Sequence, residues 1–276
     1  MEETPADDRC IIHSVPYLMT NISKVVLSSI EGSVGSVTLN RPEKKNALND
    51  ELIGQLKQTL TEVAADESVR SIVLVGSGTD FCSGADISAL EKISRASAAE
   101  NDTDARTLLD LFVLIRQLPL PVIAAVHGRA LAGGCGLASA CDIVLASRNA
   151  RFGYPEVKIG FVPAMVTAIL RRNVSEKVAF ELLTRGETID ADYAYRIGLV
   201  NRVFEDETFD GDVRKFAEAF ATLSKSAVSL TKSLLYQVDG LTFTEAIETG
   251  ADVNVIARMT EDCQKGIAQF LRRKSG

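Results

Sequence analysis

Short apolar runs rich in β-branched residues recur along the first three quarters of the chain, and they predict strands. The runs cover residues 24–30, 36–40, 71–76, 121–128, 142–147 and 198–204. Runs such as IVLV and VIAAV do not alternate between apolar and polar side chains, which is typical of strands that are covered on both faces. Stretches with helical periodicity lie between several of the runs, so the pattern predicts an α/β fold.

Polar residues and glycines mark where these elements begin and end. Gly32 and Gly35 lie between the first two runs and indicate a hairpin. Asn49 is a typical helix N-cap, and it precedes residues 50–65, where apolar side chains at helical spacing form one face. We therefore expect a helix over residues 50–65.

Two longer segments have no strand pattern. Residues 91–106 are rich in serine, alanine and charge without a sustained apolar stripe, so they form either a mobile lid or a solvated helix, and we favour the lid. Residues 209–272 carry successive helical patterns that could cover the sheet or a neighbouring subunit. The chain is thus expected to divide into a mobile N-terminal arm at 1–20, a core at 21–205 and a helical region at 206–276.

Composition and charge narrow the class of protein. The 276 residues are 46% hydrophobic, enough to bury a substantial core, and the formal net charge of −7 argues against a nucleic-acid surface. No apolar run has membrane-spanning length, and the acidic start MEETPADDRC lacks the apolar core of a signal peptide. The five cysteines form no CxxC pair, which favours a reducing cytosol over a disulfide framework. We expect a cytoplasmic protein with no nucleic-acid and no membrane partner.

Histidine chemistry and phosphate-binding loops find little support in the sequence. His13 and His127 are the only histidines, and neither has a plausible serine, cysteine or metal-ligand companion, which argues against a catalytic triad and a metal site. We expect His127 to be a hydrogen-bonded structural residue. The segment GSGTDF (76–81) lacks the third glycine of a dinucleotide-binding turn.

Three glycine-bearing turns remain as candidate catalytic sites, and each follows a predicted strand: FCSGAD (81–86), AGGCG (132–136) and FGYPEVKIG (152–160). The first two present backbone amides at the start of helical stretches, and two amides that converge on one oxygen form an oxyanion hole. The third carries Glu156 in a mainly apolar neighbourhood, where desolvation could raise its pKa toward that of a general base. Ordinary turns, tightly packed glycines and a surface carboxylate are the alternatives. Together the three turns suggest enolate chemistry.

The order of these motifs resembles that of a known family. NRPEKKNAL (40–48), FCSGADI (81–87), PVIAAVHGRALAGGCGLASACDI (121–143) and FGYPEVKIGFVP (152–163) are similar to segments of the crotonase family, the enoyl-CoA hydratase/isomerase superfamily. The likeness spans about residues 24–204 and the helical tail. It implies a spiral of ββα units, a C-terminal helical trimerisation region, an acyl-CoA substrate, and homo-trimers that often pair into hexamers.

The resemblance also implies roles for individual residues. Ala85 and Gly133 would donate their amides to the thioester oxygen, and Glu156 would be the catalytic acid and base. Gly134 would let the chain turn into the helix behind Gly133. The remaining positions would line the substrate or its CoA arm: Lys45, Ala47, Gly84, Asp86, Ile87, Ser88 and Gly136, with Phe270 and Arg273 reaching the nucleotide end from a neighbouring subunit. No metal or redox cofactor is expected besides the coenzyme A of the substrate.

One position departs from the family pattern. Hydratases with two carboxylates have a glutamate where this chain has Gly136, so only Glu156 remains. A single base suits an isomerase, because it can take a proton from C2 and deliver it to C4. The segment GGCGLA and the later segment FGYPEVKIGFVPA instead resemble the corresponding segments of hydratases of the methylglutaconyl-CoA and isohexenylglutaconyl-CoA type. We favour a hydratase, with an isomerase and a non-catalytic acyl-CoA binder as alternatives.

Several side chains beside these motifs have ordinary structural interpretations. Tyr154 is expected to pack, although its hydroxyl could orient water, and Cys135 is expected to be a buried apolar filler. Asp86 and Asp142 are typical of caps or ion-pair members. For the basic pair, Arg129 and Lys158, we favour surface acids over a substrate carboxylate as partners.

Overall fold

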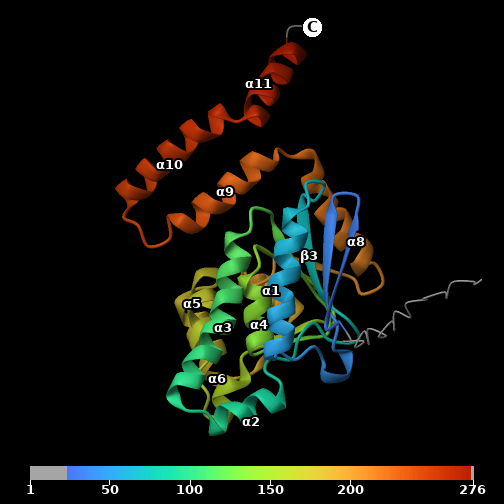
Figure 1. Ribbon diagram of the computed structural model, residues 1–276, viewed down its shortest axis with the longest axis vertical. Helices are drawn as coiled ribbons and strands as arrows, with labels where there is room; N and C mark the ends of the chain where they lie inside the picture. Colours follow the sequence, from blue (N-terminus) through green and yellow to red (C-terminus); the bar gives the residue numbers. More distant parts are fainter. Residues whose placement is uncertain (1–23, 275–276) are drawn as a thin grey trace, which may run out of the picture.

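A six-stranded sheet forms the centre of the protein in the computed structural model, which describes residues 24–274 (Figure 1). The strand order is β1-β2-β3-β4-β6-β9, and only the β1–β2 pair is antiparallel. The strands are β1 (Val26–Glu31), β2 (Val34–Leu39), β3 (Ser71–Gly76), β4 (Val122–Val126), β6 (Ile143–Ser147) and β9 (Arg202–Phe204). They confirm the predicted runs, although the last run is a strand only in its second half. The expected arm at 1–20, with His13, lies outside the described residues.

The central strands β3, β4 and β6 are covered on both faces, as the apolar runs without alternation predicted. Alternate residues such as Val73 and Leu145 pack against Phe209 and Val213 of α8 (Phe209–Glu218). The opposite face belongs to the main core. That core is built with α1 (Asp50–Ala65), α3 (Ala98–Gln117), α4 (Gly133–Ala140), α5 (Ala164–Asn173), α6 (Glu176–Arg185) and α7 (Ala191–Arg196).

Caps and turns formed by neighbouring residues mark the ends of the helices and strands that the sequence predicted. The side-chain oxygen of Asn49 accepts a hydrogen bond from the Leu52 N–H at 2.9 Å and caps α1. Gly32 has a φ of +61° in the turn between β1 and β2, which confirms the hairpin. Residues 91–106 lie in α2 (Ile87–Arg95) and in the first half of α3, joined by a capping box at Ser97. Their conformation is that of the solvated helix, and a lid movement stays a prediction.

A second, smaller sheet carries the candidate turns. It contains β5 (Arg129–Leu131), β7 (Arg151–Gly153) and β8 (Thr188–Asp190), in that order. The hydrophobic pattern did not reveal these strands, because three residues are too few to show a period of two. β5 leads into α4, and β7 leads into the short 3₁₀ helix η2 (Pro155–Ile159). The small sheet thus sets the AGGCG turn beside the turn that carries Glu156.

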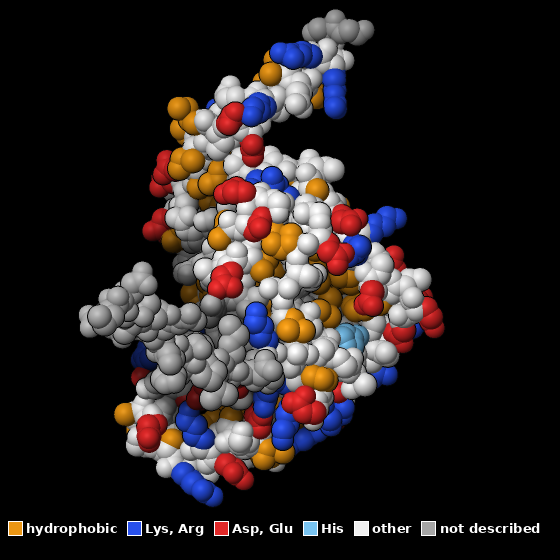
Figure 2. Space-filling model, turned by 45° about the vertical axis from the view of Figure 1, so that its right-hand side comes forward, with side chains coloured by type: hydrophobic (Ala, Val, Ile, Leu, Met, Phe, Trp, Pro, Cys, Tyr) orange, Lys and Arg blue, Asp and Glu red, His pale blue; other side chains and the backbone are white. Residues whose placement is uncertain are grey.

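The C-terminal helices project from this body (Figure 1). They are α9 (Lys225–Gln237), α10 (Phe243–Met259) and α11 (Glu261–Lys274). Elsewhere in the chain, short 3₁₀ helices form at η1 (Pro42–Lys44), before α1, and at η3 (Ala219–Thr222), after α8. α9 is held to the body by Lys232, whose ammonium is 2.7 Å from the Asp142 carboxylate, so the ion-pair expectation for Asp142 is confirmed. α10 and α11 expose the large apolar side chains of Phe243, Ile247, Val255, Ile256, Met259, Ile267 and Phe270. Figure 2 shows apolar side chains on the projecting end of the molecule.

Within residues 24–274, no helix combines the length and the apolar character that a bilayer crossing requires.

Candidate active site

The Ala85 amide is left free by the way its neighbours are bonded. Leu48 pairs with Ala85 as an isolated parallel bridge. The Leu48 N–H donates to the Gly84 oxygen at 2.7 Å, and the Asp86 N–H donates to the Leu48 oxygen at 2.9 Å. In such a bridge the N–H of the middle residue points away from the partner strand. Ala85 is exposed, and its N–H has no hydrogen-bond partner among the described residues, so it can serve a ligand.

The Gly133 amide is oriented by a strained residue before it. Ala132 has φ 50° and ψ −128°, a region that residues with a side chain rarely adopt and that costs about 1–3 kcal/mol. Its own N–H donates to the Gly153 oxygen at 2.8 Å, and its carbonyl accepts the Gly136 N–H at 2.9 Å. α4 begins at Gly133, whose N–H has no partner among residues 24–274. Because ψ of Ala132 turns the peptide that follows, this strain sets the direction of the Gly133 N–H.

The two turns lie side by side. The Leu131 N–H donates to the Cys82 oxygen at 3.0 Å, and Gly84 has a φ of +96°. A Cβ on Gly84 would be 2.8 Å from the Cβ of Ala132, so any larger residue would push the turns apart. This packing sets the Ala85 and Gly133 segments beside one another, and their action on one ligand stays a prediction.

The three glycines of the AGGCG turn are there for different reasons. A Cβ on Gly134 would meet the Cys82 oxygen at 2.2 Å, and one on Gly136 would meet the Val166 Cγ1 at 2.3 Å. Both positions are therefore tightly packed. A Cβ on Gly133 would approach only the Leu48 Cδ1, at 3.3 Å. Packing alone does not require a glycine there, which leaves room for a ligand beside its amide. The packing interpretation is confirmed at Gly134 and Gly136, and the amide-donor interpretation of Gly133 stays a prediction.

Glu156 lies on η2 directly after Pro155. Its side chain is half-buried, and its Oε2 is buried without a hydrogen-bond partner within the described part of the chain. Burial raises the pKa of the Glu156 carboxyl above its usual range, while a hydrogen bond from its own backbone amide acts in the opposite direction. A carboxylate with a free, poorly solvated oxygen is a stronger base than an ordinary glutamate, so the structure supports proton transfer at this position.

The side chains around Glu156 behave as expected from the sequence. Tyr154 is fully buried, with its hydroxyl 3.1 Å from the Ser139 hydroxyl, so the packing role is confirmed. Cys135 is also fully buried, and burial, with a smaller contribution from the charge of Glu156, raises the pKa of its thiol to about 11. A thiol with this pKa stays protonated at neutral pH, which confirms the filler interpretation.

The structure brings some of the other predicted residues to the Ala85 turn. Lys45, with a left-handed φ of 52°, accepts the Ser83 N–H on its carbonyl at 3.0 Å, and Ala47 is buried beside it. Ile87 and Ser88 are exposed at the start of α2. Phe270 and Arg273 lie on α11, which projects away from the turns, so a single chain does not bring them together (Figure 1).

One expectation for the basic residues is wrong. The Arg129 guanidinium makes two hydrogen bonds to the carboxylate of Asp80, at 2.7 and 3.0 Å, and Asp80 is buried instead of lying on the surface. The Arg129–Asp80 pair therefore connects β5 to the GSGTDF turn. For Lys158 the expectation stays a prediction: the pKa of the exposed Glu187 is lowered mainly by its hydrogen bond with Arg185, and the charge of Lys158 adds only a smaller contribution. His127 has its Nε2 3.1 Å from the Gly78 oxygen, which confirms a structural hydrogen bond.

Arg41 and Asn46 also shape the site, and the sequence analysis did not single them out. Asn46 is fully buried with φ 54°, and its amide donates to the Ser77 and Asp80 oxygens at 2.9 and 2.8 Å. The available signal was an asparagine in the turn-like segment PEKKNA, since asparagine tolerates the left-handed region.

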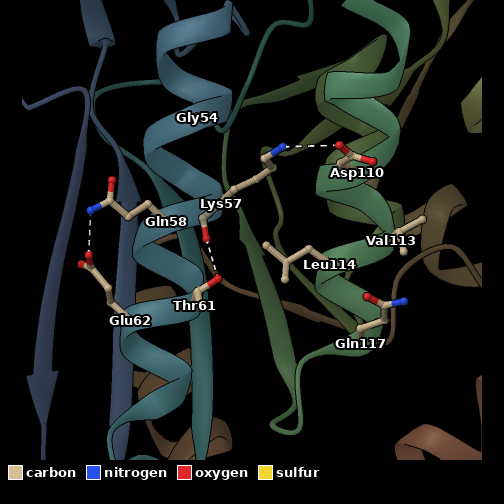
Figure 3. Close-up of a pocket in the computed structure, with 9 residues that line it drawn as sticks. All are labelled: Gly54, Lys57, Gln58, Thr61, Glu62, Asp110, Val113, Leu114 and Gln117. Carbon is tan, nitrogen blue, oxygen red and sulfur yellow. Dashed lines mark hydrogen bonds and ion pairs between the residues drawn. The ribbon is translucent and has the colours of Figure 1, made fainter. Parts of the chain in front are cut away.

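A separate groove of about 750 Å³ lies between α1 and α3 (Figure 3). Lys57 and Asp110 face one another across it at 3.7 Å. None of the predicted site residues line this groove, so it is not part of the candidate site. Among residues 24–274, no three histidine, cysteine, aspartate or glutamate side chains gather as metal ligands would.

Comparisons with known proteins identify the family of this chain. The family model described as enoyl-CoA hydratase/isomerase matches residues 29–275. A putative enoyl-CoA hydratase of Thermus thermophilus is 40% identical over 88% of this chain and 96% of its own length. The 2,3-dehydroadipyl-CoA hydratase of Escherichia coli is 35% identical over 87% of this chain and 92% of its own. The crystal structure of an enoyl-CoA hydratase from Mycobacterium smegmatis superposes with a TM-score of 0.85, at 33% identity, covering 90% of this chain and 96% of that one. The chain therefore belongs to the enoyl-CoA hydratase/isomerase family and has the crotonase fold, as its motifs predicted.

Proposed function

We propose that the protein is an enoyl-CoA hydratase that adds water across the C2–C3 double bond of a 2-enoyl-CoA thioester. The observation that carries this proposal is the presence of a half-buried Glu156 carboxylate, whose Oε2 has no hydrogen-bond partner among the described residues, together with two adjacent turns whose amides are free. Membership of the family, and relatives named as hydratases of enoyl-CoA esters, support the same reaction.

In this proposal the amides of Ala85 and Gly133 hold the thioester oxygen. As water adds to C3, the electrons of the double bond move toward the carbonyl, and the oxygen becomes that of an enolate. The two N–H groups, with the positive end of the α4 dipole, stabilise this charge. A donor of this kind is worth about 10²-fold to 10³-fold in rate.

Glu156 carries the proton. Its carboxylate removes a proton from water while the water oxygen bonds to C3, and the resulting carboxylic acid then protonates C2 of the enolate. One carboxylate performs both steps when the hydroxyl and the proton are added to the same face of the double bond. Its raised pKa favours the first step by making the carboxylate more basic. The sequence assigns no step to a metal or redox cofactor, and we propose that none is needed.

The isomerase is the second candidate, because position 136 has no room for a second carboxylate. Absorbance of the conjugated thioester separates the reactions. Loss of absorbance with crotonyl-CoA supports hydration, and a gain with a 3-enoyl-CoA supports isomerisation. No change of absorbance with either ester, alongside measurable binding, would favour the acyl-CoA binder or an enzyme with an unusual acyl substrate.

The acyl group is also a proposal. Because Asp80 already neutralises Arg129, that guanidinium is not free to pair with a carboxylate at the far end of a substrate. We propose an uncharged unsaturated acyl group over a dicarboxylic one of the methylglutaconyl type. A panel of CoA esters with and without a terminal carboxylate tests this, and a preference for the dicarboxylic esters would overturn it.

We further propose that the chain forms homo-trimers, or hexamers made from two trimers, in the cytoplasm. The apolar side chains exposed on α10 and α11 support an association through these helices. Phe270 and Arg273 would then reach the CoA of a neighbouring subunit. Light scattering after size exclusion should give about three or six times the chain mass of 29.7 kDa. A monomer at micromolar concentration would contradict the proposal.

A further inference from the structure

The Arg41 side chain joins two segments that the proposed chemistry needs. Its Nη1 donates to the Ala47 oxygen at 2.6 Å, and its Nη2 donates to the Asp86 carboxylate at 2.7 Å. Ala47 precedes Leu48, and Asp86 follows Ala85. One guanidinium therefore holds both sides of the bridge that aims the Ala85 amide.

Asp86 transmits this contact to the turn. One carboxylate oxygen accepts from the Ser88 N–H and hydroxyl, both at 3.0 Å, and caps α2, while the other faces Arg41. Burial alone would raise the pKa of Asp86, but the hydrogen bonds from Arg41 and Ser88 outweigh it and keep the pKa below its usual value. The carboxylate therefore stays ionised and fixed on both sides.

The backbone that carries Arg41 is itself fixed. The Arg41 N–H donates to the Asn46 side chain at 2.9 Å, and the Asn46 N–H donates to the Arg41 oxygen at 2.9 Å. The loop is thus closed on itself before the arginine reaches out of it. The Arg41 side chain is only 13% exposed, so water competes little for its hydrogen bonds.

We propose that Arg41 is a positioning residue, which acts through Asp86 and Ala47 to hold the Ala85 N–H in line with the thioester oxygen. The inference rests on the proposed function, since it needs Ala85 as a donor. A displacement of about 1 Å in a catalytic group costs about 10²-fold in rate. Loss of Arg41 therefore lowers kcat more than it raises KM.

The test combines kinetics with the infrared band of a bound thioester. Butyryl-CoA labelled with ¹³C at the carbonyl is not hydrated, and hydrogen bonds from the protein move its carbonyl band to lower wavenumber. We expect Arg41→Gln to lower kcat about 10-fold to 100-fold and to lose part of the band shift. Arg41→Lys should lie between this variant and the wild type. Asp86→Asn keeps a capping oxygen for α2 but loses the ionised partner, so it should behave like Arg41→Gln.

The control is Arg148→Gln, which removes an arginine that pairs with Glu205 and Asp192 away from the turns. This variant should keep the wild-type kcat and the wild-type shift of the carbonyl band. Folded Arg41→Gln and Asp86→Asn variants with the wild-type kcat and band shift would overturn the positioning role. If Arg41→Gln does not fold, Asp86→Asn decides alone. A wild-type band without any shift would instead overturn the oxyanion role of Ala85, and the positioning role with it.

Discussion

The amide side and the carboxyl side of the candidate site are built in opposite ways. The amides of Ala85 and Gly133 belong to backbone held by bridges, by a strained residue and by glycines in close contact with neighbouring atoms. Glu156 is a single side chain whose Oε2 no described residue contacts through a hydrogen bond. The amide side therefore depends on geometry, and the carboxyl side depends on chemical identity and burial.

This difference predicts how each side responds to substitution. On the amide side, a change of one methyl group acts through packing, so stability and rate should change together. On the carboxyl side, an isosteric change leaves packing intact, so the rate should change without loss of stability. The variants below test this separation.

The largest effect is expected for Glu156→Gln. The amide has nearly the same shape but cannot take a proton from water, so kcat should fall by about 10³-fold. Steady-state hydration of crotonyl-CoA measures the loss, and calorimetry with butyryl-CoA should show nearly unchanged affinity.

Glu187→Gln is the matched control, because Glu187 is an exposed acid paired with Arg185. It should keep the wild-type rate. A Glu156→Gln variant that retains most of its kcat would remove Glu156 from the mechanism.

On the amide side, alanine at two consecutive glycines should act differently. In Gly134→Ala the new Cβ would meet the Cys82 oxygen at 2.2 Å, so the backbone must shift. We expect about a 10²-fold loss of kcat and a destabilisation of about 1–3 kcal/mol. In Gly133→Ala only the Leu48 Cδ1 lies near, so the thermal midpoint should stay close to that of the wild type while the affinity for butyryl-CoA falls. Equal losses of stability in both variants would show that both glycines serve packing alone.

Gly136 provides a further test of packing on the amide side, because it lies in α4 and packs against Val166 of α5. A Cβ there would overlap Val166, so Gly136→Ala should destabilise the fold by about 1–3 kcal/mol in spite of the better helix propensity of alanine. Val166→Ala opens the space. The double variant should therefore be more stable than the sum of the single effects by about 0.5–3 kcal/mol in urea unfolding. Additive effects would mean that Val166 does not fill the space at position 136.

The sequence predicted most of the main sheet, because β2, β3, β4 and β6 are apolar runs with mostly buried side chains. It also predicted α1, where an N-cap and a regular apolar face agree. The second sheet was missed because its strands have three residues each. Within the site, glycines and proline mark turns directly, so the turns around Ala85, Gly133 and Glu156 could be read from the chain.

The contacts that refine the site could not be predicted in this way. The overlap of Gly136 with Val166 joins residues on different helices, and the Arg41–Asp86 pair spans 45 positions. Neither leaves a periodic signal. The partner of Arg129 was predicted wrongly because the burial of Asp80 depends on how the GSGTDF turn packs against β5. The strain at Ala132 is likewise invisible, since alanine carries no preference for a positive φ.

The smallest predicted effect is a gain in stability for Glu156→Gln near neutral pH. The pKa of Glu156 is raised in the folded protein, so between the unfolded and the folded pKa the native state holds more protons than the unfolded chain. Stability from this group therefore falls as pH rises through that interval, and the ionised carboxylate is a cost above it. Glutamine never ionises and avoids the cost. Urea unfolding should show the variant as the more stable protein at pH 7, with the difference vanishing below about pH 4, where glutamate is protonated in both states. A variant less stable than the wild type at pH 7 would mean that the carboxylate is held by favourable contacts, and the carboxyl side would then be organised like the amide side.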